Sequence, residues 1–169
     1  MSGCSWHAGF VTISSSRDER FAAYAASHVW FDHPQGPFVV DPREPGFTKG
    51  RFAGPTGETV YVVTAHNPGR LLSDADNDAR HAELLAYVAT GSGLTMWPTV
   101  GGDRSWSHTE QGVAVMGLDD DGARALGRRF GQEAIFAWDE RALRLLECGS
   151  SDEPELGWSV ERWEREGPP

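Results

Sequence analysis

Residues 58–77, ETVYVVTAHNPGRLLSDADN, combine the clearest strand pattern of the chain with the start of a helix. The apolar run at 60–63 ends in the polar turn 64–68, and Ser73 is placed to cap the helix that follows. A strand that leads through a short loop into a helix N-terminus gathers unpaired backbone N–H groups at the positive end of the helix dipole. Such a junction suits a polar or anionic ligand, so the stretch marks both the fold and a candidate site.

The pattern from residue 58 onward predicts the element order β-α-β-β-α-β. The predicted strands are 58–65, 94–100, 112–118 and 133–138, the helices are 74–91 and 121–130, and an extra C-terminal hairpin strand covers 142–148. This order is typical of the ferredoxin-like split β-α-β fold of the α+β class, whose first and third strands are central. Pro98 then falls in the second strand, which this topology places at an edge where a missing N–H costs least.

The flanking segments complete the expected organisation. Spacing of apolar residues predicts an N-terminal helix over 17–31, capped by Ser15 or Ser16, then a short strand at 38–40 and a Gly- and Pro-rich loop over 44–57. We expect residues 1–16 to be a tail and residues 17–149 to form a single α+β domain, with 150–169 as an acidic tail containing Trp158 and Trp163.

Composition narrows the classes of function. The net charge is −10, and Lys49 is the only lysine among 15 basic residues, so nucleic acid and anionic membranes are not expected as partners. No apolar stretch is long enough to span a membrane, no signal peptide is evident, and Cys4 and Cys148 lack paired spacing. These features indicate a cytoplasmic protein, and the absence of known nucleotide and metal motifs indicates no cofactor.

Strand direction predicts that three polar segments meet at one rim of the sheet: the turn 64–68, the loop 101–111 with Trp106, His108 and Glu110, and the turn 130–132. Helical spacing adds Asn77 and His81, which share the core-facing side of helix 74–91. We expect His66 and Glu110 to be acid/base groups. The predicted substrate-binding residues are Thr64, Asn67, Asn77, Arg80, His81 and Gln132, and no metal site is expected.

Each of these residues also has a purely structural interpretation. Asn67 precedes a proline and can brace the turn, and His66 or His81 can be a buried hydrogen-bonding residue. Arg80 can pair with acidic neighbours on its helix, and Gln132 can simply begin a strand. The run Asp119-Asp120-Asp121 suggests a metal site at first, but it is more simply explained as a helix N-cap.

Three motifs resemble those of an uncharacterised bacterial family, domain-of-unknown-function family 3293. They are Thr64-Ala65-His66-Asn67-Pro68, the helix start at 72–77, and GRRFGQEAI at 127–135. The similarity covers about residues 24–146. Family members usually carry Glu-x-Ser where this chain has Glu110-Gln111-Gly112, so that Ser is missing here. The resemblance implies the same three motif regions and brings no known activity with it.

Two functions remain open from the sequence. The first is a small enzyme or ligand-binding protein that acts on a small, polar, anionic molecule at the rim. The second is a non-catalytic interaction module whose acidic, Trp-rich surface binds a basic protein or a second copy of the chain.

Overall fold

The computed structural model describes residues 16–169, which contain three helices and nine strands. Their bounds are α1 Arg17–Ala25, β1 His28–Phe31, β2 Phe38–Arg43, β3 Thr48–Lys49, β4 Val60–Thr64, α2 Asp74–Ala89, β5 Thr95–Gly102, β6 Thr109–Met116, α3 Asp120–Arg129, β7 Ala134–Trp138, β8 Leu143–Glu147 and β9 Glu155–Arg162. Apart from Ser16, the tail expected over residues 1–16 lies outside the described residues.

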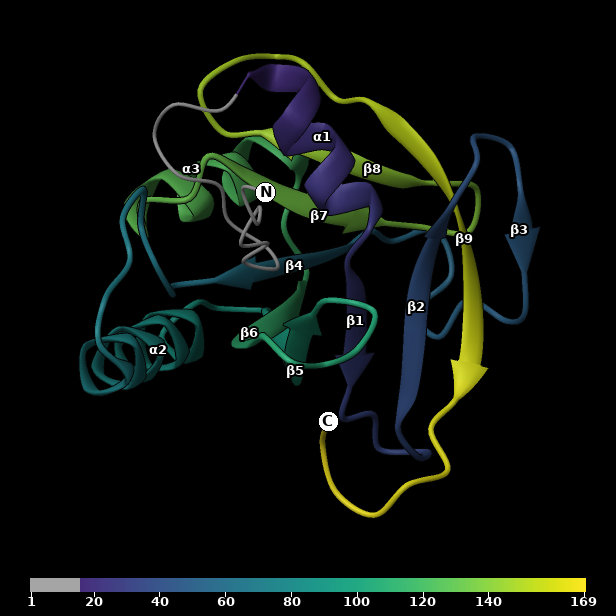
Figure 1. Ribbon diagram of the computed structural model, residues 1–169, viewed down its shortest axis with the longest axis horizontal. Helices are drawn as coiled ribbons and strands as arrows, with labels where there is room; N and C mark the ends of the chain where they lie inside the picture. The colour runs from purple at the N-terminus through teal and green to yellow at the C-terminus, as the bar shows by residue number, and fades with distance from the viewer. Residues whose placement is uncertain (1–15) are drawn as a thin grey trace, which may run out of the picture.

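The strands form a closed antiparallel barrel of eight strands (Figure 1). Their order is β2-β1-β5-β6-β4-β7-β8-β9, and β9 pairs back with β2 along residues 38–43 and 157–162. The short strand β3 adds to β9 in parallel. Closure leaves none of the eight barrel strands as a free edge.

The ferredoxin-like α+β fold predicted from the sequence is therefore wrong. The four strands of the predicted unit lie in the order β5-β6-β4-β7, but they are half of a barrel wall and not an open sheet. β1 pairs with β5 and β9 pairs with β8, so both expected edges, β5 and the hairpin strand β8, are covered. The sequence pattern from residue 58 onward predicted how β4 to β7 pair with one another. It carries little information on which distant strands complete the sheet.

Pro98 is not at an edge, because β5 lies between β1 and β6. The Asp32 N–H donates to the Pro98 carbonyl at 2.9 Å, while β1 itself ends at Phe31 opposite Thr99. In an antiparallel ladder the N–H and C=O of one residue point to the same neighbour. A backbone N–H at position 98 would therefore point toward Asp32, just after the end of β1. Proline at this position costs the sheet only one hydrogen bond.

The predicted helix over 17–31 is shorter than expected and its second half is a strand. α1 begins with a capping box, in which Ser16 and Glu19 bond each other's backbone N–H groups, and it ends at Ala25. The sequence HVWF at 28–31 then forms β1, with Val29 and Phe31 in the barrel core. Its β-branched and aromatic residues favour a strand, and pairing with both β2 and β5 outweighs the helical spacing.

Residues 150–169 do not form a separate tail. Glu155–Arg162 is β9, the strand that closes the barrel, and Trp158 is buried in the barrel core against Trp138. Trp163 follows the strand and donates its backbone N–H to Pro37 at 3.0 Å. Acidic residues at 152, 153 and 155 made this segment resemble a solvated tail in the sequence.

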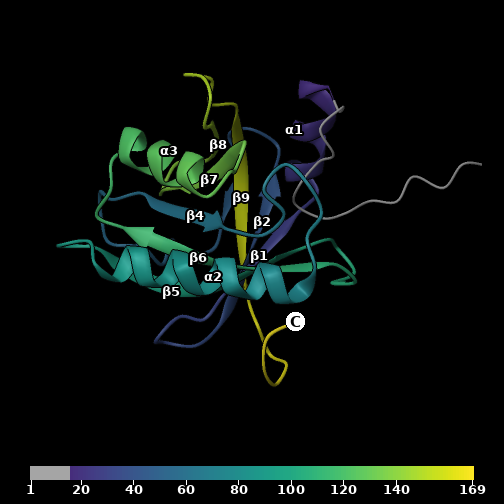
Figure 2. The same cartoon turned by 90° about the vertical axis from the view of Figure 1, so that its left-hand side faces the viewer.

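Two apolar cores lie on opposite sides of the barrel wall. The first fills the barrel and includes Phe31, Trp138 and Trp158. The second lies outside, where α2 and α3 pack on β4, β6 and β7 through residues such as Leu84 and Leu126. Figure 2 faces this side and shows both helices in front of the strands. Alternate residues of β4, β6 and β7 therefore point to different cores.

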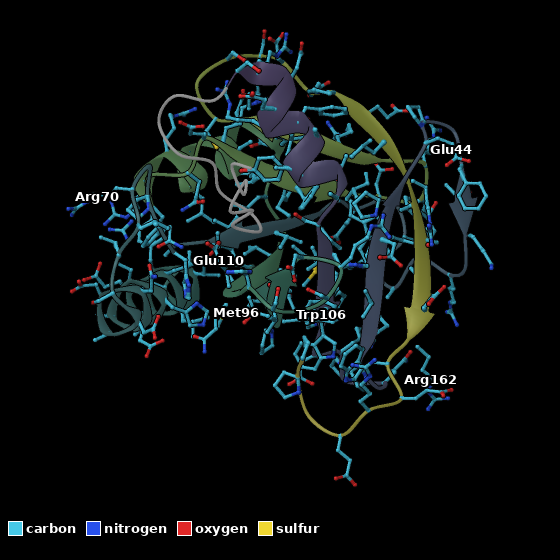
Figure 3. All side chains as sticks on the ribbon, in the orientation of Figure 1. Glu44, Arg70, Met96, Trp106, Glu110 and Arg162 are labelled. Carbon is cyan, nitrogen blue, oxygen red and sulfur yellow. The ribbon has the colours of Figure 1, made fainter. Side chains whose placement is uncertain are left out.

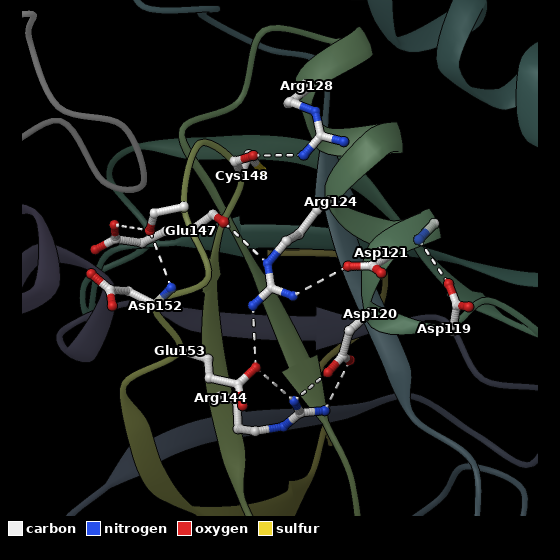
Figure 4. A network of polar contacts seen from close by, with 12 residues as sticks. Asp119, Asp120, Asp121, Arg124, Arg128, Arg144, Glu147, Cys148, Asp152 and Glu153 are labelled. Atoms are coloured by element: carbon white, nitrogen blue, oxygen red, sulfur yellow. Dashed lines mark hydrogen bonds and ion pairs between the residues drawn. The ribbon is translucent and has the colours of Figure 1, made fainter.

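The acidic run at 119–121 begins α3 and forms ion pairs (Figure 4). Asp119 accepts the Gly122 N–H at 2.8 Å as the N-cap. Asp120 pairs with Arg144 at 2.7 Å, and this guanidinium lowers the pKa of Asp120. Arg124 in turn reaches Glu153 at 3.2 Å. The run thus fixes α3 to β8 and to the loop before β9.

Candidate functional site

The eight predicted site residues lie in one connected group, which we call the rim cluster. It comprises Thr64, His66, Asn67, Asn77, Arg80, His81, Glu110 and Gln132. The strand-to-helix junction, the start of β6 and the turn after α3 each contribute to it. Sequence reasoning thus placed these residues together, although the sheet that carries them is a barrel.

Asn67 is the centre of the cluster. Its φ of 44° is a left-handed conformation, which Asn tolerates better than most residues. Its Oδ1 accepts the Leu72 N–H at 3.0 Å and Asn77 Nδ2 at 3.1 Å, and its backbone N–H donates to Asn77 Oδ1 at 2.9 Å. Its Nδ2 donates to Glu110 Oε1 at 2.7 Å. Asn67 therefore braces the turn and also orients Glu110.

Arg80 and Gln132 bind backbone carbonyls. Arg80 donates from Nε to Ala65 O and from Nη2 to Phe130 O, both at 2.7 Å. Gln132 Nε2 donates to His66 O at 3.0 Å. Both side chains tie the turn after β4 to the turn after α3, so Arg80 is engaged in the fold and does not pair with the acidic residues of its own helix.

The turn after α3 needs a glycine. Gly131 has a φ of 73°, and a Cβ there would lie 2.5 Å from Pro68 Cβ. The N–H groups of Gly131 and Gln132 donate to Arg128 O and Gly127 O, the pair of bonds that defines a Schellman C-cap. The close approach of Gly131 to Pro68 brings the turn after α3 into contact with the turn after β4.

Glu110 is the most perturbed carboxyl of the described residues. It lies on β6 and is only 7% exposed. Burial raises its pKa from 4.5 to about 8, although the hydrogen bond from Asn67 opposes this change. Oε1 is held by Asn67, whereas Oε2 is buried without a hydrogen-bond partner. A carboxyl with this pKa is mostly protonated at neutral pH and can either donate or accept a proton there.

Glu110 faces a cavity of about 40 Å³ at one end of the barrel, which we call the Glu110 cavity. Five strands and α1 line it: Tyr24, Ser27, His28, Val29, Val62, Thr64, Thr99, Gly101, Gly102, Glu110, Gly112, Ala134, Ile135 and Phe136. Figure 3 places Glu110 on the side of the molecule that carries α2, away from Glu44 and Arg162. The hydroxyl of Thr99 in this lining is also buried without a partner. Glu110 Oε2 and Thr99 Oγ1 are thus two buried oxygens of the lining without a partner, and Nε2 of the lining residue His28 is a buried nitrogen without one.

Three other hydroxyls of the lining are used by the fold, and one of them, Ser27 Oγ, donates to Ala23 O at 2.9 Å. Thr64 Oγ1 donates to Gln111 O at 2.8 Å and accepts the His66 N–H at 3.1 Å. Tyr24 Oη donates to Ala134 O at 3.2 Å, which attaches α1 to the barrel end. Burial raises the pKa of Tyr24 well above its usual value, so this phenol stays neutral. Among the side-chain oxygens of the lining, Glu110 Oε2 and Thr99 Oγ1 are the ones buried without a partner.

His66 and His81 form a separate part of the rim cluster. Their ring centroids are 6.2 Å apart, and no hydrogen bond or ion pair joins His66 to Glu110. Burial lowers the pKa of both imidazoles, and the neighbouring His81 lowers that of His66 further. His66 therefore does not act directly on Glu110 in this arrangement.

A family model described as "Protein of unknown function (DUF3293)" matches residues 63–135. We call these matched residues the DUF3293 segment. The predicted resemblance is confirmed for the family, and the match is narrower than the expected 24–146. It runs from the end of β4 to the start of β7 and contains the whole rim cluster. No curated protein and no solved structure matches the chain.

Outside the DUF3293 segment, sequence reasoning missed the residues that complete the cavity and a second polar pair. Tyr24, Ser27 and Val29 reach the cavity from α1 and β1, which were read as one helix. His28 Nδ1 contacts Asp41 Oδ1 across β1 and β2, and its ring stacks on Trp106 at 5.3 Å. Only the correct strand assignment of 28–31 would have revealed that pair.

Within the DUF3293 segment, Thr99 was also missed, and part of the loop 101–111 does not join the cluster. Thr99 lies two residues from Trp97 and from Gly101, so strand alternation alone could have placed it inward. Trp106 packs on His28 outside the barrel, and His108 lies beside Asp103 at 3.7 Å. Of the three loop residues expected at the rim, Glu110 alone bonds to the cluster.

Within residues 16–169, no group of three or more His, Cys, Asp or Glu side chains is arranged to hold a metal ion. The same described part has no helix that is long and apolar enough to cross a membrane. Cys148 is buried, and burial raises the pKa of its thiol to about 11. This cysteine therefore stays protonated and behaves as a small core residue.

Proposed function

We propose that this protein binds a small polar molecule in the Glu110 cavity and that Glu110 exchanges a proton with it, as an enzyme or as a ligand-binding protein. The observation that carries this proposal is the pair of buried, unpartnered atoms Glu110 Oε2 and Thr99 Oγ1 on one cavity. Leaving such groups unpaired costs about 1–3 kcal/mol each, so a bound molecule with matching hydrogen bonds would recover that energy. Mouths of β-barrels commonly hold ligands.

The lining favours an uncharged molecule over the anion suggested by the sequence. No lysine or arginine lines the cavity, and Arg80 donates to two carbonyls. An anion beside Glu110 would have no cation to offset its charge. A cavity of about 40 Å³ holds at most a few waters, so a larger ligand must displace α1 at Tyr24.

The interaction-module hypothesis loses its main support. Trp158 is 3% exposed in the barrel core, and the segment 155–162 is a barrel strand. Its deletion would therefore disturb the fold and would not test an interaction. A homodimer or a basic protein partner stays a prediction. Our proposal retains a cytoplasmic setting, on the basis of two cysteines without paired spacing.

Ligand-observed NMR with small uncharged amides, ureas and alcohols tests the proposal. We expect at least one class to bind wild-type protein and to lose about tenfold or more in affinity in Glu110→Gln and in Thr99→Val, since each hydrogen bond contributes about 1.5 kcal/mol or more when charged or buried groups are left unpaired. Glu140→Gln and Thr95→Val, at exposed positions, should bind as the wild type does.

The rival interpretation is that ordered water satisfies Glu110 and Thr99. In that case no compound of the panel would bind, and Thr99→Val would leave every saturation-transfer signal unchanged. A ligand whose affinity is the same in wild type, Glu110→Gln and Thr99→Val would also contradict the proposal, because it would bind elsewhere.

A further inference from the structure

We propose that His66 and His81 together bind a divalent transition metal ion such as Cu²⁺ or Zn²⁺ between the turn after β4 and helix α2. This site is distinct from the Glu110 cavity, and the proposal does not depend on the function proposed above.

The proposal is based on one nitrogen without a hydrogen-bond partner on each of the two imidazole rings. Nε2 of His66 and Nδ1 of His81 are both buried and make no hydrogen bond. His66 as a whole is 8% exposed, so solvent does little to satisfy it. An imidazole nitrogen with a free lone pair is a preferred ligand of zinc, copper and nickel. A metal ion would satisfy both nitrogens at once.

The ring spacing permits one ion to bridge the two residues. The centroids are 6.2 Å apart and the ring planes are at 78°. Metal–nitrogen distances are near 2.0–2.1 Å, so one ion between the rings would hold its two nitrogens about 3–4 Å apart. The proposal therefore requires the two rings to turn so that His66 Nε2 and His81 Nδ1 face one ion.

The backbones of both histidines are already fixed. His66 donates its N–H to Thr64 Oγ1 and accepts from Gln132 Nε2 through its carbonyl. His81 lies in the middle of α2, where the helix sets its position. The surrounding bonds thus hold the two ligands at a constant spacing, which lowers the entropy cost of binding.

The electrostatic setting suits a cation. Burial keeps both imidazoles neutral at pH 7, which is the form that coordinates metal. Asp78 lies one turn before His81 on α2 and interacts with both rings, and Asp74 interacts with His66. These exposed carboxylates add negative charge near the two rings. Water would occupy the other positions.

Titration of the full chain, without a histidine tag and freed of metal by chelation, tests the site. Calorimetry should give one ion per chain, with affinity highest for Cu²⁺, lower for Ni²⁺ and Zn²⁺, and no binding of Mg²⁺, which prefers oxygen ligands. His66→Asn and His81→Asn should each lower Cu²⁺ affinity at least tenfold. His108→Asn and His33→Asn, which change histidines away from the pair, are the matched controls.

A spectroscopic readout keeps the test independent of the variants' folding. In ¹H–¹⁵N spectra of wild-type protein, added Zn²⁺ should shift His66 Nε2 and His81 Nδ1 and leave His108 unchanged. Copper that binds equally to wild type and to the variant with both His66→Asn and His81→Asn, or zinc that shifts neither ring, would overturn the proposal and assign both nitrogens to ordered water.

Discussion

Glu110 makes the stability of the protein depend on pH in an unusual direction for a carboxyl. Its pKa is about 8 in the folded chain and near the ordinary 4.5 when unfolded. The folded state therefore binds the proton of Glu110 more tightly than the unfolded state does. The contribution of this proton to stability is fully present below pH 4.5 and is lost progressively as pH rises to about 8. At about 1.4 kcal/mol per pKa unit, roughly 5 kcal/mol is the upper limit of this loss.

We expect the free energy of unfolding of Glu110→Gln to lack this decline. In urea denaturation between pH 5 and 9, the free energy of unfolding of the variant should rise relative to that of the wild type as pH rises. The difference should level off near pH 8. Glu140→Gln, on an exposed turn, is the control and should follow the wild type. Parallel curves for wild type and Glu110→Gln would mean that Glu110 ionises normally.

Individual residues of the rim cluster could be predicted from the sequence because local sequence patterns determine their positions. A polar turn after a strand, an N-cap and a helical period are enough to bring Asn67, Asn77 and His81 together. The bonding of Arg80 and Gln132 to carbonyls could not be predicted, because it depends on the spacing of two turns 65 residues apart.

Strand β9 depends on a glycine where it passes the β2–β3 turn. A Cβ on Gly157 would lie 2.3 Å from the carbonyl oxygens of Glu44 and Phe47. Backbone atoms cannot move aside as a flexible side chain can, so we expect Gly157→Ala to cost about 2 kcal/mol or more. Gly149→Ala adds a Cβ into open space and is the matched control.

Thermal unfolding of both alanine variants measures this difference. The Tm of Gly157→Ala should fall clearly below that of Gly149→Ala, whose Tm should stay close to the wild-type value. Equal Tm values would show that β9 shifts freely at this point and does not fix the turn.

Most elements after residue 58 were predicted, and before it the start of α1 and the first half of β2 were predicted while β1 was missed. α2, α3 and β4 to β8 have clear periods and caps, and their observed bounds lie close to the predicted ones. Residues 28–31 fit a helical period through Tyr24 and His28, and four residues are too few for strand alternation to compete. Only pairing with β2 and β5 decides their conformation.

Barrel closure should make the last strand essential to cooperative folding. A chain ending at residue 154 would lose β9 together with the buried Leu156 and Trp158, and it would expose the edges of β2 and β8. We expect it to lose its single unfolding transition in urea, followed by near-UV circular dichroism. A chain ending at residue 167 keeps β9 and the contact of Trp163 with Gly167, and should unfold as the full chain does.

The barrel as a whole lay beyond prediction because closure is a long-range property. β2 and β9 are joined by pairs such as Val40 with Val160. The local sequence of either strand does not indicate which strand it pairs with. An intact single transition in the chain ending at 154 would show that seven strands suffice for the fold.

The pairing of β2 with β9 also bears on how the protein is made. A ribosome releases β2 early and β9 last, so the hydrogen bonds along residues 38–43 cannot form until synthesis of residues 157–162 is complete. Throughout that interval the nascent chain presents an open strand edge that is rich in valine and phenylalanine, the type of surface that chaperones shield. The barrel therefore closes only after β9 has been made, when most of the residues of the DUF3293 segment have had time to pair among themselves.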